Sequence, residues 1–263
     1  MVHPEQIQSF FPAQIRNSPA HRKYMLKEYI QLMILDYLSN TPFVRKIVFI
    51  GGTGLRLVKG IDRFSEDLDF DCKQLSETGF AEMADGVLAF LQSSGWRVEA
   101  REKAGSKLKA FRKNIYFPEL LFELGLSGYR EERFLIKLEG QDQGVEYAAV
   151  MANIRGCGFF FPFPVPPDDV LCAMKLSALL SRRKGRDFYD AMFLLAQTKP
   201  NYAYLTQKWN IRNWTELKEA LLKTLEKVDL KKKSQDFEHL LFHGNSSKIL
   251  LFGEFIEELK FES

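Results

Sequence analysis

The hydrophobic positions of this chain follow a helical period in some stretches and a strand period in others. Residues 21–38 carry a single apolar stripe, which predicts a long helix that ends before Pro42. Residues 47–50 are continuously apolar and predict a buried strand, and the glycine-rich stretch 51–54 predicts a tight turn that opens a short helix. A second strand is expected at 67–71. The pattern leaves open whether these two strands run parallel or antiparallel.

Further elements follow in the first 140 residues. Ser76 is a suitable N-cap for a helix that runs to about residue 93. The segments 96–101 and 111–117 alternate like strands and predict a hairpin, and 134–139 predicts another strand. The tip of this hairpin is expected to be basic. Its positive residues are Arg101, Lys103, Lys107, Lys109, Arg112 and Lys113.

The pattern changes after the proline-rich stretch 159–167, which we interpret as an extended connector because proline suits neither a helix interior nor a central strand. Helices are expected at 168–181 and 186–197. Two or three more are expected within 202–262, interrupted at Gly244 and Gly253.

The predicted fold class is therefore α/β, a mixed sheet with flanking helices followed by a helical C-terminal domain. The predicted domains are 1–160, which is α/β, and 161–263, which is helical and expected to contribute to the active-site cleft.

Composition narrows the class of protein. The chain has 263 residues, of which 46% are hydrophobic and 27% charged, so it can bury a sizeable core. A net charge of +3 permits contact with nucleic acid without demanding it. The three cysteines, Cys72, Cys157 and Cys172, form no metal-binding or disulfide pattern. Neither a secretory signal nor a membrane span is evident, so we expect a cytoplasmic protein.

The strongest chemical signal is the pair formed by the glycine turn and the acidic strand. Asp67, Asp69 and Asp71 alternate with Leu68 and Phe70, which places the three carboxylates on one strand face. Clustered carboxylates repel one another unless a cation neutralises them, and Mg²⁺ prefers oxygen ligands that it shares with phosphates. The turn opens a helix, whose first N–H groups favour anions. Together the two features predict a metal-dependent phosphate-transfer site.

The motifs GGTGLRL and RFSEDLDF resemble the glycine turn and D-x-D strand of nucleotidyltransferases, and in particular the AbiEii/AbiGii-type nucleotidyltransferase toxins. The segment MKLSALLSRRKGRDFYD is similar to the continuation of that family, a helical lysine followed by an R-D-x-x-D segment. The matching portions cover less than half of the chain. One departure is that Thr53 stands where the wider fold usually has serine.

The resemblance implies a role for each matching residue. Asp67 and Asp69 would hold Mg²⁺, and Gly52 and Thr53 would cradle the β- and γ-phosphates of an NTP. Glu139 is the candidate third carboxylate, as metal ligand or as base, although a surface strand with paired Lys137 and Glu139 explains it nearly as well. The implied roles in the C-terminal part are those of Lys175 as a triphosphate contact, and of Asp187 or Asp190 in positioning the lysine or the nucleotide.

The resemblance also implies a reaction and partners. The chain would move a nucleoside monophosphate from an NTP to a hydroxyl of RNA, with the 3′ end of tRNA as the leading acceptor, and would act as a toxin with a cognate antitoxin. Two alternatives stay open. One is a nucleotidyltransferase of the same fold that modifies a small-molecule hydroxyl, and the other is a non-catalytic module that binds nucleotide or RNA.

Overall fold

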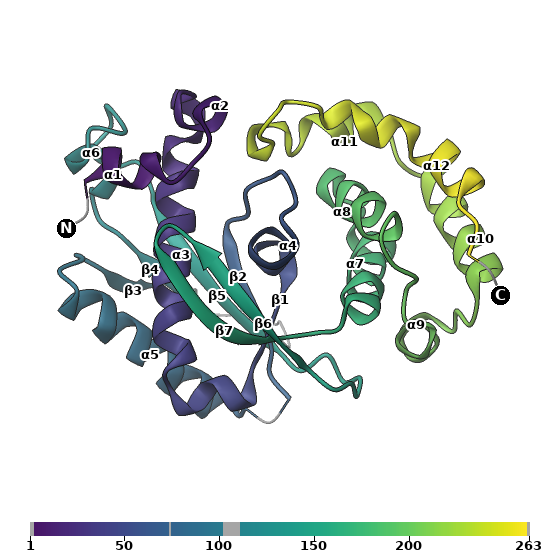
Figure 1. Ribbon diagram of the computed structural model, residues 1–263, viewed down its shortest axis with the longest axis horizontal. Helices are drawn as coiled ribbons and strands as arrows, with labels where there is room; N and C mark the ends of the chain where they lie inside the picture. The colour runs from purple at the N-terminus through teal and green to yellow at the C-terminus, as the bar shows by residue number, and fades with distance from the viewer. Residues whose placement is uncertain (1–2, 74, 102–110, 262–263) are drawn as a thin grey trace. The chain divides into compact units, whose positions relative to one another are not determined.

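A computed structural model describes residues 3–73, 75–101 and 111–261 of the chain. The fold divides into two compact units (Figure 1). The first comprises residues 1–144 and 149–165, and the second comprises residues 145–148 and 166–263. The predicted α/β class is confirmed, with a mixed sheet, flanking helices and a helical C-terminal region.

The first unit is built on a five-stranded sheet with the strand order β1-β2-β5-β4-β3. The strands are β1 (Val48–Ile50), β2 (Asp67–Asp71), β3 (Glu99–Arg101), β4 (Phe111–Tyr116) and β5 (Leu135–Gln141). β2 is antiparallel to β1 and parallel to β5, which settles the direction that the sequence left open. β3 and β4 form the predicted antiparallel hairpin, whose expected basic tip at 102–110 lies outside the described residues.

Helices and short 3₁₀ turns surround this sheet. They are α1 (Pro4–Ser9), α2 (Ala13–Arg16), η1 (Pro19–His21), α3 (Arg22–Ser39), η2 (Pro42–Lys46), α4 (Gly51–Lys59), α5 (Glu77–Ser93) and α6 (Leu120–Glu123). The long predicted helix is α3, and it is buried along most of its length because its apolar residues face neighbours on several sides. The predicted cap of α5 is confirmed, since Ser76 Oγ accepts the N–H of Gly79 at 3.1 Å.

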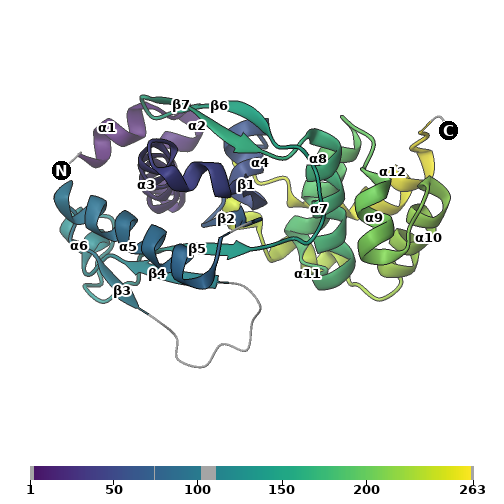
Figure 2. The same ribbon diagram turned by 90° about the horizontal axis from the view of Figure 1, so that it is seen from below.

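The proline-rich stretch is not the connector that the sequence predicts. Residues Phe159–Val165 form strand β7, which pairs with β6 (Val150–Gly156) in an antiparallel two-stranded sheet. A two-stranded sheet tolerates Pro162 and Pro164 because each strand needs hydrogen bonds on only one side. Figure 2 shows α3 between this pair and strands β4 and β5. Phe163 of β7 also packs against Phe49 of β1 and Phe70 of β2, so β7 completes the core of the unit.

The second unit is helical. Its elements are α7 (Asp168–Arg182), α8 (Gly185–Leu195), α9 (Tyr202–Trp209), α10 (Trp214–Leu225), α11 (Leu230–Gln235), η3 (Glu238–Leu240), η4 (Ser246–Leu251) and α12 (Phe252–Glu258). The expected interruption at Gly253 is wrong, because that glycine lies inside α12. Across the described residues, no helix is long and apolar enough to cross a membrane.

Candidate active site

The acidic strand β2 presents two of its three aspartates on a partly exposed face. Leu68 and Phe70 are buried in the core, while Asp67 and Asp69 on the opposite face are partly accessible. Asp71 is fully buried, and its Oδ1 accepts the backbone N–H of Gln143 at 2.9 Å. Asp71 therefore fixes the chain after β5, and the accessible acids of this strand are Asp67 and Asp69.

The predicted glycine turn is the first turn of helix α4, which starts at Gly51 directly after β1. Gly51 has φ +78°, a left-handed conformation that favours glycine. A Cβ atom at this position would overlap the carboxylate of Asp69. The absence of a side chain therefore lets the Asp69 carboxylate rest against the start of α4.

Thr53 attaches α4 to the acidic strand. Its side chain is 1% exposed, and its hydroxyl donates a hydrogen bond to the backbone carbonyl of Asp67. A hydroxyl has one proton to donate, so this proton is engaged within the protein. The arrangement gives Thr53 a positioning function for Asp67.

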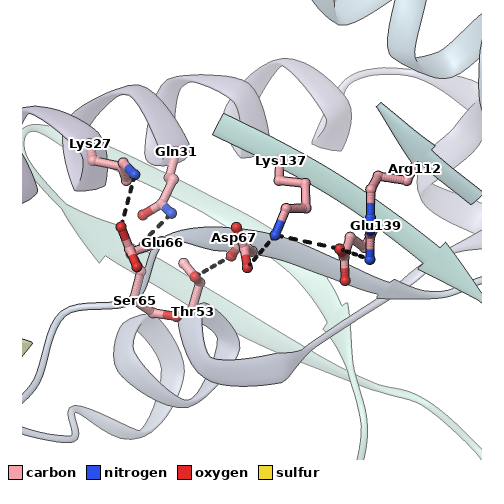
Figure 3. A network of polar contacts seen from close by, with 9 residues as sticks. All are labelled: Lys27, Gln31, Thr53, Ser65, Glu66, Asp67, Arg112, Lys137 and Glu139. Atoms are coloured by element: carbon pink, nitrogen blue, oxygen red, sulfur yellow. Dashed lines mark hydrogen bonds and ion pairs between the residues drawn. The ribbon is translucent and has the colours of Figure 1, made fainter. Parts of the chain in front are cut away.

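The parallel register of β2 and β5 brings two rows of polar side chains onto one face of the sheet. Asp67 is the register partner of Lys137, and Asp69 is the partner of Glu139. The second row extends to β4, where Arg112 is the partner of Glu139. Lys137 Nζ lies 3.1 Å from Asp67 Oδ2 and 3.6 Å from Glu139 Oε1 (Figure 3).

Arg112 completes this group of charges. Its Nη2 lies 2.7 Å from Glu139 Oε1 and forms an ion pair with it. Glu139 Oε1 is buried and accepts no hydrogen bond of good geometry, so the contact is electrostatic. We call Asp67, Lys137, Glu139 and Arg112 the sheet-face network. Its four side chains are between 24% and 31% exposed, so solvent reaches all of them.

The donor set on this face fits a hard divalent cation. Among the described residues, no group of three or more His, Cys, Asp or Glu side chains gathers into a metal site. Mg²⁺, however, is commonly bound by one or two carboxylates together with substrate phosphates, and Asp67 and Asp69 supply such a pair. The Lys137 ammonium donates a hydrogen bond to Asp67 Oδ2 at 3.1 Å, so this face already binds one positive group of the protein itself.

Two residues beside the glycine turn were missed by the sequence analysis. A Cβ atom on Gly52 would lie 2.5 Å from Ser65 Oγ and 3.1 Å from the guanidinium of Arg63. Arg63 is 1% exposed and donates to the carbonyl of Phe64 at 2.9 Å. Both residues lie in the loop before β2, where no periodicity exists, and only their position inside RFSEDLDF could have drawn attention to them.

In the second unit, Lys175 and Asp190 form a buried ion pair between helices α7 and α8. Lys175 Nζ lies 2.8 Å from Asp190 Oδ2, and the side chains are 6% and 1% exposed. A buried charge needs a partner because transfer out of water is costly. The ion pair therefore holds helix α7 against helix α8.

Asp187 has a different environment from Asp190. Its fully buried carboxylate receives three hydrogen bonds from the guanidinium of Arg182, at 2.8 to 3.1 Å, and the backbone N–H of Lys184 at 3.0 Å. The last of these bonds caps the start of α8. Through these contacts Asp187 stabilises the turn between α7 and α8.

The three cysteine thiols are shielded from solvent to a degree that disfavours the thiolate form. Burial is the main cause that raises the pKa of each thiol, Cys72, Cys157 and Cys172, to about 12. A thiol with such a pKa stays protonated at neutral pH, and the thiolate is the reactive form.

Comparison with known protein families gives one match that covers most of the chain. The model of the family described as "Nucleotidyl transferase AbiEii toxin, Type IV TA system" matches residues 33–245, which include every candidate site residue. A comparison with curated proteins finds no match.

Among solved structures, the chain is similar to MenT4, a nucleotidyltransferase toxin from Mycobacterium tuberculosis, with a TM-score of 0.61 and 15% sequence identity. The match covers 99% of this chain and 91% of MenT4. A second similarity is to JHP933 from Helicobacter pylori, with a TM-score of 0.48 and 18% identity, covering 89% of this chain and 94% of that protein. The first of these supports the fold.

Proposed function

The chain belongs to the AbiEii family of nucleotidyltransferase toxins of type IV toxin–antitoxin systems, and on that premise we propose that it transfers a nucleoside monophosphate from an NTP to an RNA hydroxyl in a Mg²⁺-dependent reaction. The 3′ end of tRNA is the first acceptor to test. The family implies an NTP substrate and a cognate antitoxin.

The observation that carries the proposal is the contact between the acidic strand and the start of α4. Asp69 packs against Gly51, and Thr53 holds the backbone of Asp67. A carboxylate pair therefore adjoins a helix N-terminus, whose N–H groups attract phosphate oxygens. This is the combination that a metal-bound triphosphate requires.

Asp67 and Asp69 are proposed to hold the metal ion. When bound, the ion would neutralise charge on the triphosphate and orient it. Gly52 is proposed to contribute its backbone to the phosphate site; because it has no side chain, Ser65 and the guanidinium of Arg63 can pack against the start of α4. Thr53 supports Asp67 through its hydroxyl, in place of a direct phosphate contact.

The proposed reaction is a displacement at the α-phosphorus of the NTP. The acceptor oxygen forms a bond to that phosphorus, and the bond between the α-phosphorus and the bridging oxygen to the β-phosphate breaks. Pyrophosphate leaves with the electrons of that bond, and the proton of the acceptor hydroxyl passes to water. Positioning and electrostatic stabilisation supply most of the rate in such transfers.

The residues of the second unit have proposed supporting roles. Lys175 is proposed to supply positive charge to the triphosphate, with its ammonium oriented by Asp190. Asp187 is proposed to maintain the turn that follows α7, through Arg182 and the cap of α8. We therefore expect Asp187 substitutions to act through stability and Lys175 substitutions to affect the apparent affinity for NTP as well.

The experiment is incubation of the purified protein with Mg²⁺, each labelled NTP in turn, and either total RNA or purified tRNA. Label in tRNA supports the proposal, and loss of label with EDTA supports the metal requirement. The matched variants are Asp69→Asn and Asp85→Asn, since Asp85 is an exposed acid that pairs with Lys113 at 3.1 Å. Absence of label in any RNA, with a small hydroxyl compound labelled instead, would overturn the RNA acceptor.

A further inference from the structure

The sheet-face network contains two positive side chains where a nucleotidyl-transfer site is expected to be acidic. Lys137 extends from β5, the strand between β2 and β4, and its ammonium is placed between the carboxylates of Asp67 and Glu139. Arg112 approaches Glu139 from β4. The strand register fixes all four positions, so the network is a built feature of the sheet and not a chance surface contact.

The charges of this face limit how many metal ions it can attract. Asp67, Asp69 and Glu139 carry three negative charges and Lys137 and Arg112 carry two positive charges, so the formal charge of these five side chains is −1. Sites with two metal ions hold them about 3.5–4 Å apart and use carboxylates to offset four positive charges. One divalent cation suits this face far better than two.

We propose that the Lys137 ammonium, held by Asp67 and Glu139, fills the place of a second metal ion, so that the protein binds a single divalent cation through Asp67 and Asp69. Glu139 then acts as a positioning residue that anchors Lys137, and it is not a metal ligand. The inference rests on the proposed function, because it concerns the same carboxylates.

The geometry supports this assignment for Glu139. Its Oε1 faces both Arg112 at 2.7 Å and Lys137 at 3.6 Å, so a metal ion on that oxygen would have to displace two cationic groups. Asp69, in contrast, rests against Gly51 at the start of α4. A charged group at a few ångströms from a bound ion changes the affinity strongly even at an effective dielectric constant of about 20.

The test is the stoichiometry of Mn²⁺ binding to the free protein, measured by electron paramagnetic resonance without nucleotide. The wild type is expected to bind one ion per chain. Lys137→Met is expected to bind a second ion, or to bind the first at least about tenfold more tightly, because a nearby positive charge is gone. Lys137→Arg keeps the charge and is expected to bind one ion.

The matched control is Lys113→Met. Lys113 lies on β4 beside Arg112 but points to the opposite face, where it pairs with Asp85. This variant loses the same charge from the same sheet, and its Mn²⁺ binding is expected to equal that of the wild type. An equal gain in Lys113→Met and Lys137→Met would contradict the assignment, because a general change in net charge would then explain both.

The outcomes separate this inference from the proposed function. Two ions bound to the wild type would overturn the role of Lys137 and leave a metal site in place, a result that does not depend on the folding of any variant. Binding of one ion that Asp69→Asn abolishes, with no change in Lys137→Met, would also overturn it. A wild type that binds no ion without nucleotide would overturn the inference, whereas the proposed metal site is overturned only if labelling of RNA is unchanged by EDTA.

Discussion

Two regions of the molecule pair lysine or arginine with acids, and they do so in different surroundings. In the sheet-face network every side chain is between 24% and 31% exposed, so each side chain is partly in contact with water. Between α7 and α8, the acids Asp187 and Asp190 are completely buried. The sheet-face charges can rearrange around a ligand at small cost, whereas the buried acids must keep their partners for the fold to survive.

The largest expected effect is in the buried pair. Lys175→Met removes the 2.8 Å ion pair from the buried Asp190, and we expect the free energy of unfolding to fall by about 3–5 kcal/mol. Urea unfolding measures this change. The double variant Lys175→Met/Asp190→Leu is expected to regain most of the stability and to remain inactive. A single variant that unfolds like the wild type would remove the distinction between the two regions.

The second prediction concerns Gly51 at the sheet face. Gly51→Ala adds both the strain of a left-handed residue and an overlap with Asp69. We expect the free energy of unfolding to fall by about 2–3 kcal/mol and nearly all transferase activity to be lost. Gly60→Ala is the matched control, since Gly60 has φ +74° and no atom within 4 Å of a built Cβ. It should cost about 1–2 kcal/mol from the backbone alone and leave transfer intact.

Equal stability losses and equal activities in Gly51→Ala and Gly60→Ala would contradict the contact between Gly51 and Asp69. Thermal unfolding gives the stability comparison, and incorporation of labelled nucleotide gives the activity comparison.

The third prediction compares two arginines of similar exposure. Arg112 and Arg182 have side chains that are 31% and 44% exposed, but their acceptors differ, because Glu139 is partly exposed and Asp187 is fully buried. Arg182→Gln is expected to lower the free energy of unfolding by about 1–3 kcal/mol, and Arg112→Gln to lower it by less than about 1 kcal/mol. Paired urea titrations test the difference, and a larger loss for Arg112→Gln would reverse our interpretation of the two regions.

The smallest effect on the free energy of unfolding at neutral pH is expected from the cysteines. Burial raises the pKa of Cys72 and Cys172 to about 12, above the value of about 8.5 in an unfolded chain. The unfolded state therefore loses thiol protons first as the pH rises, so this contribution to stability is complete below about pH 8.5 and declines above it. Urea unfolding from pH 7 to 10 measures the decline. Cys172→Ala should show a shallower decline, and an unchanged profile would contradict this cause.

Local patterns predicted much of the fold because they depend on a few neighbouring residues. The recurring apolar residues of α3, the Ser76 cap and the alternation around Asp67 and Asp69 each predict an element by themselves, although α3 is buried on several sides and not along one stripe. The strand β7 was missed because Pro162 and Pro164 argue against a strand until its single partner β6 is known. The strand order is a long-range property that the sequence alone did not reveal.

The same limit applies to the candidate site. Asp67 and Asp69 carry a local signal, and so does the glycine turn. The pairing of Glu139 with Arg112 depends on the register of β4 against β5, and the approach of Arg63 to Gly52 depends on how a loop folds back. The burial of Asp187 could not be inferred from its place in the R-D-x-x-D segment, although that burial changes its proposed role.

The partly exposed carboxylates of β2, Asp67 and Asp69, are the residues that we propose to be essential for transfer. The most direct measurement is single-turnover transfer of labelled nucleotide to RNA by Asp69→Asn, with far-ultraviolet circular dichroism and urea unfolding on the same sample. We predict a loss of at least about a hundredfold in rate with stability equal to or above that of the wild type, because one repelling charge is removed from the acidic strand. Transfer at the wild-type rate by a folded Asp69→Asn protein would contradict the account.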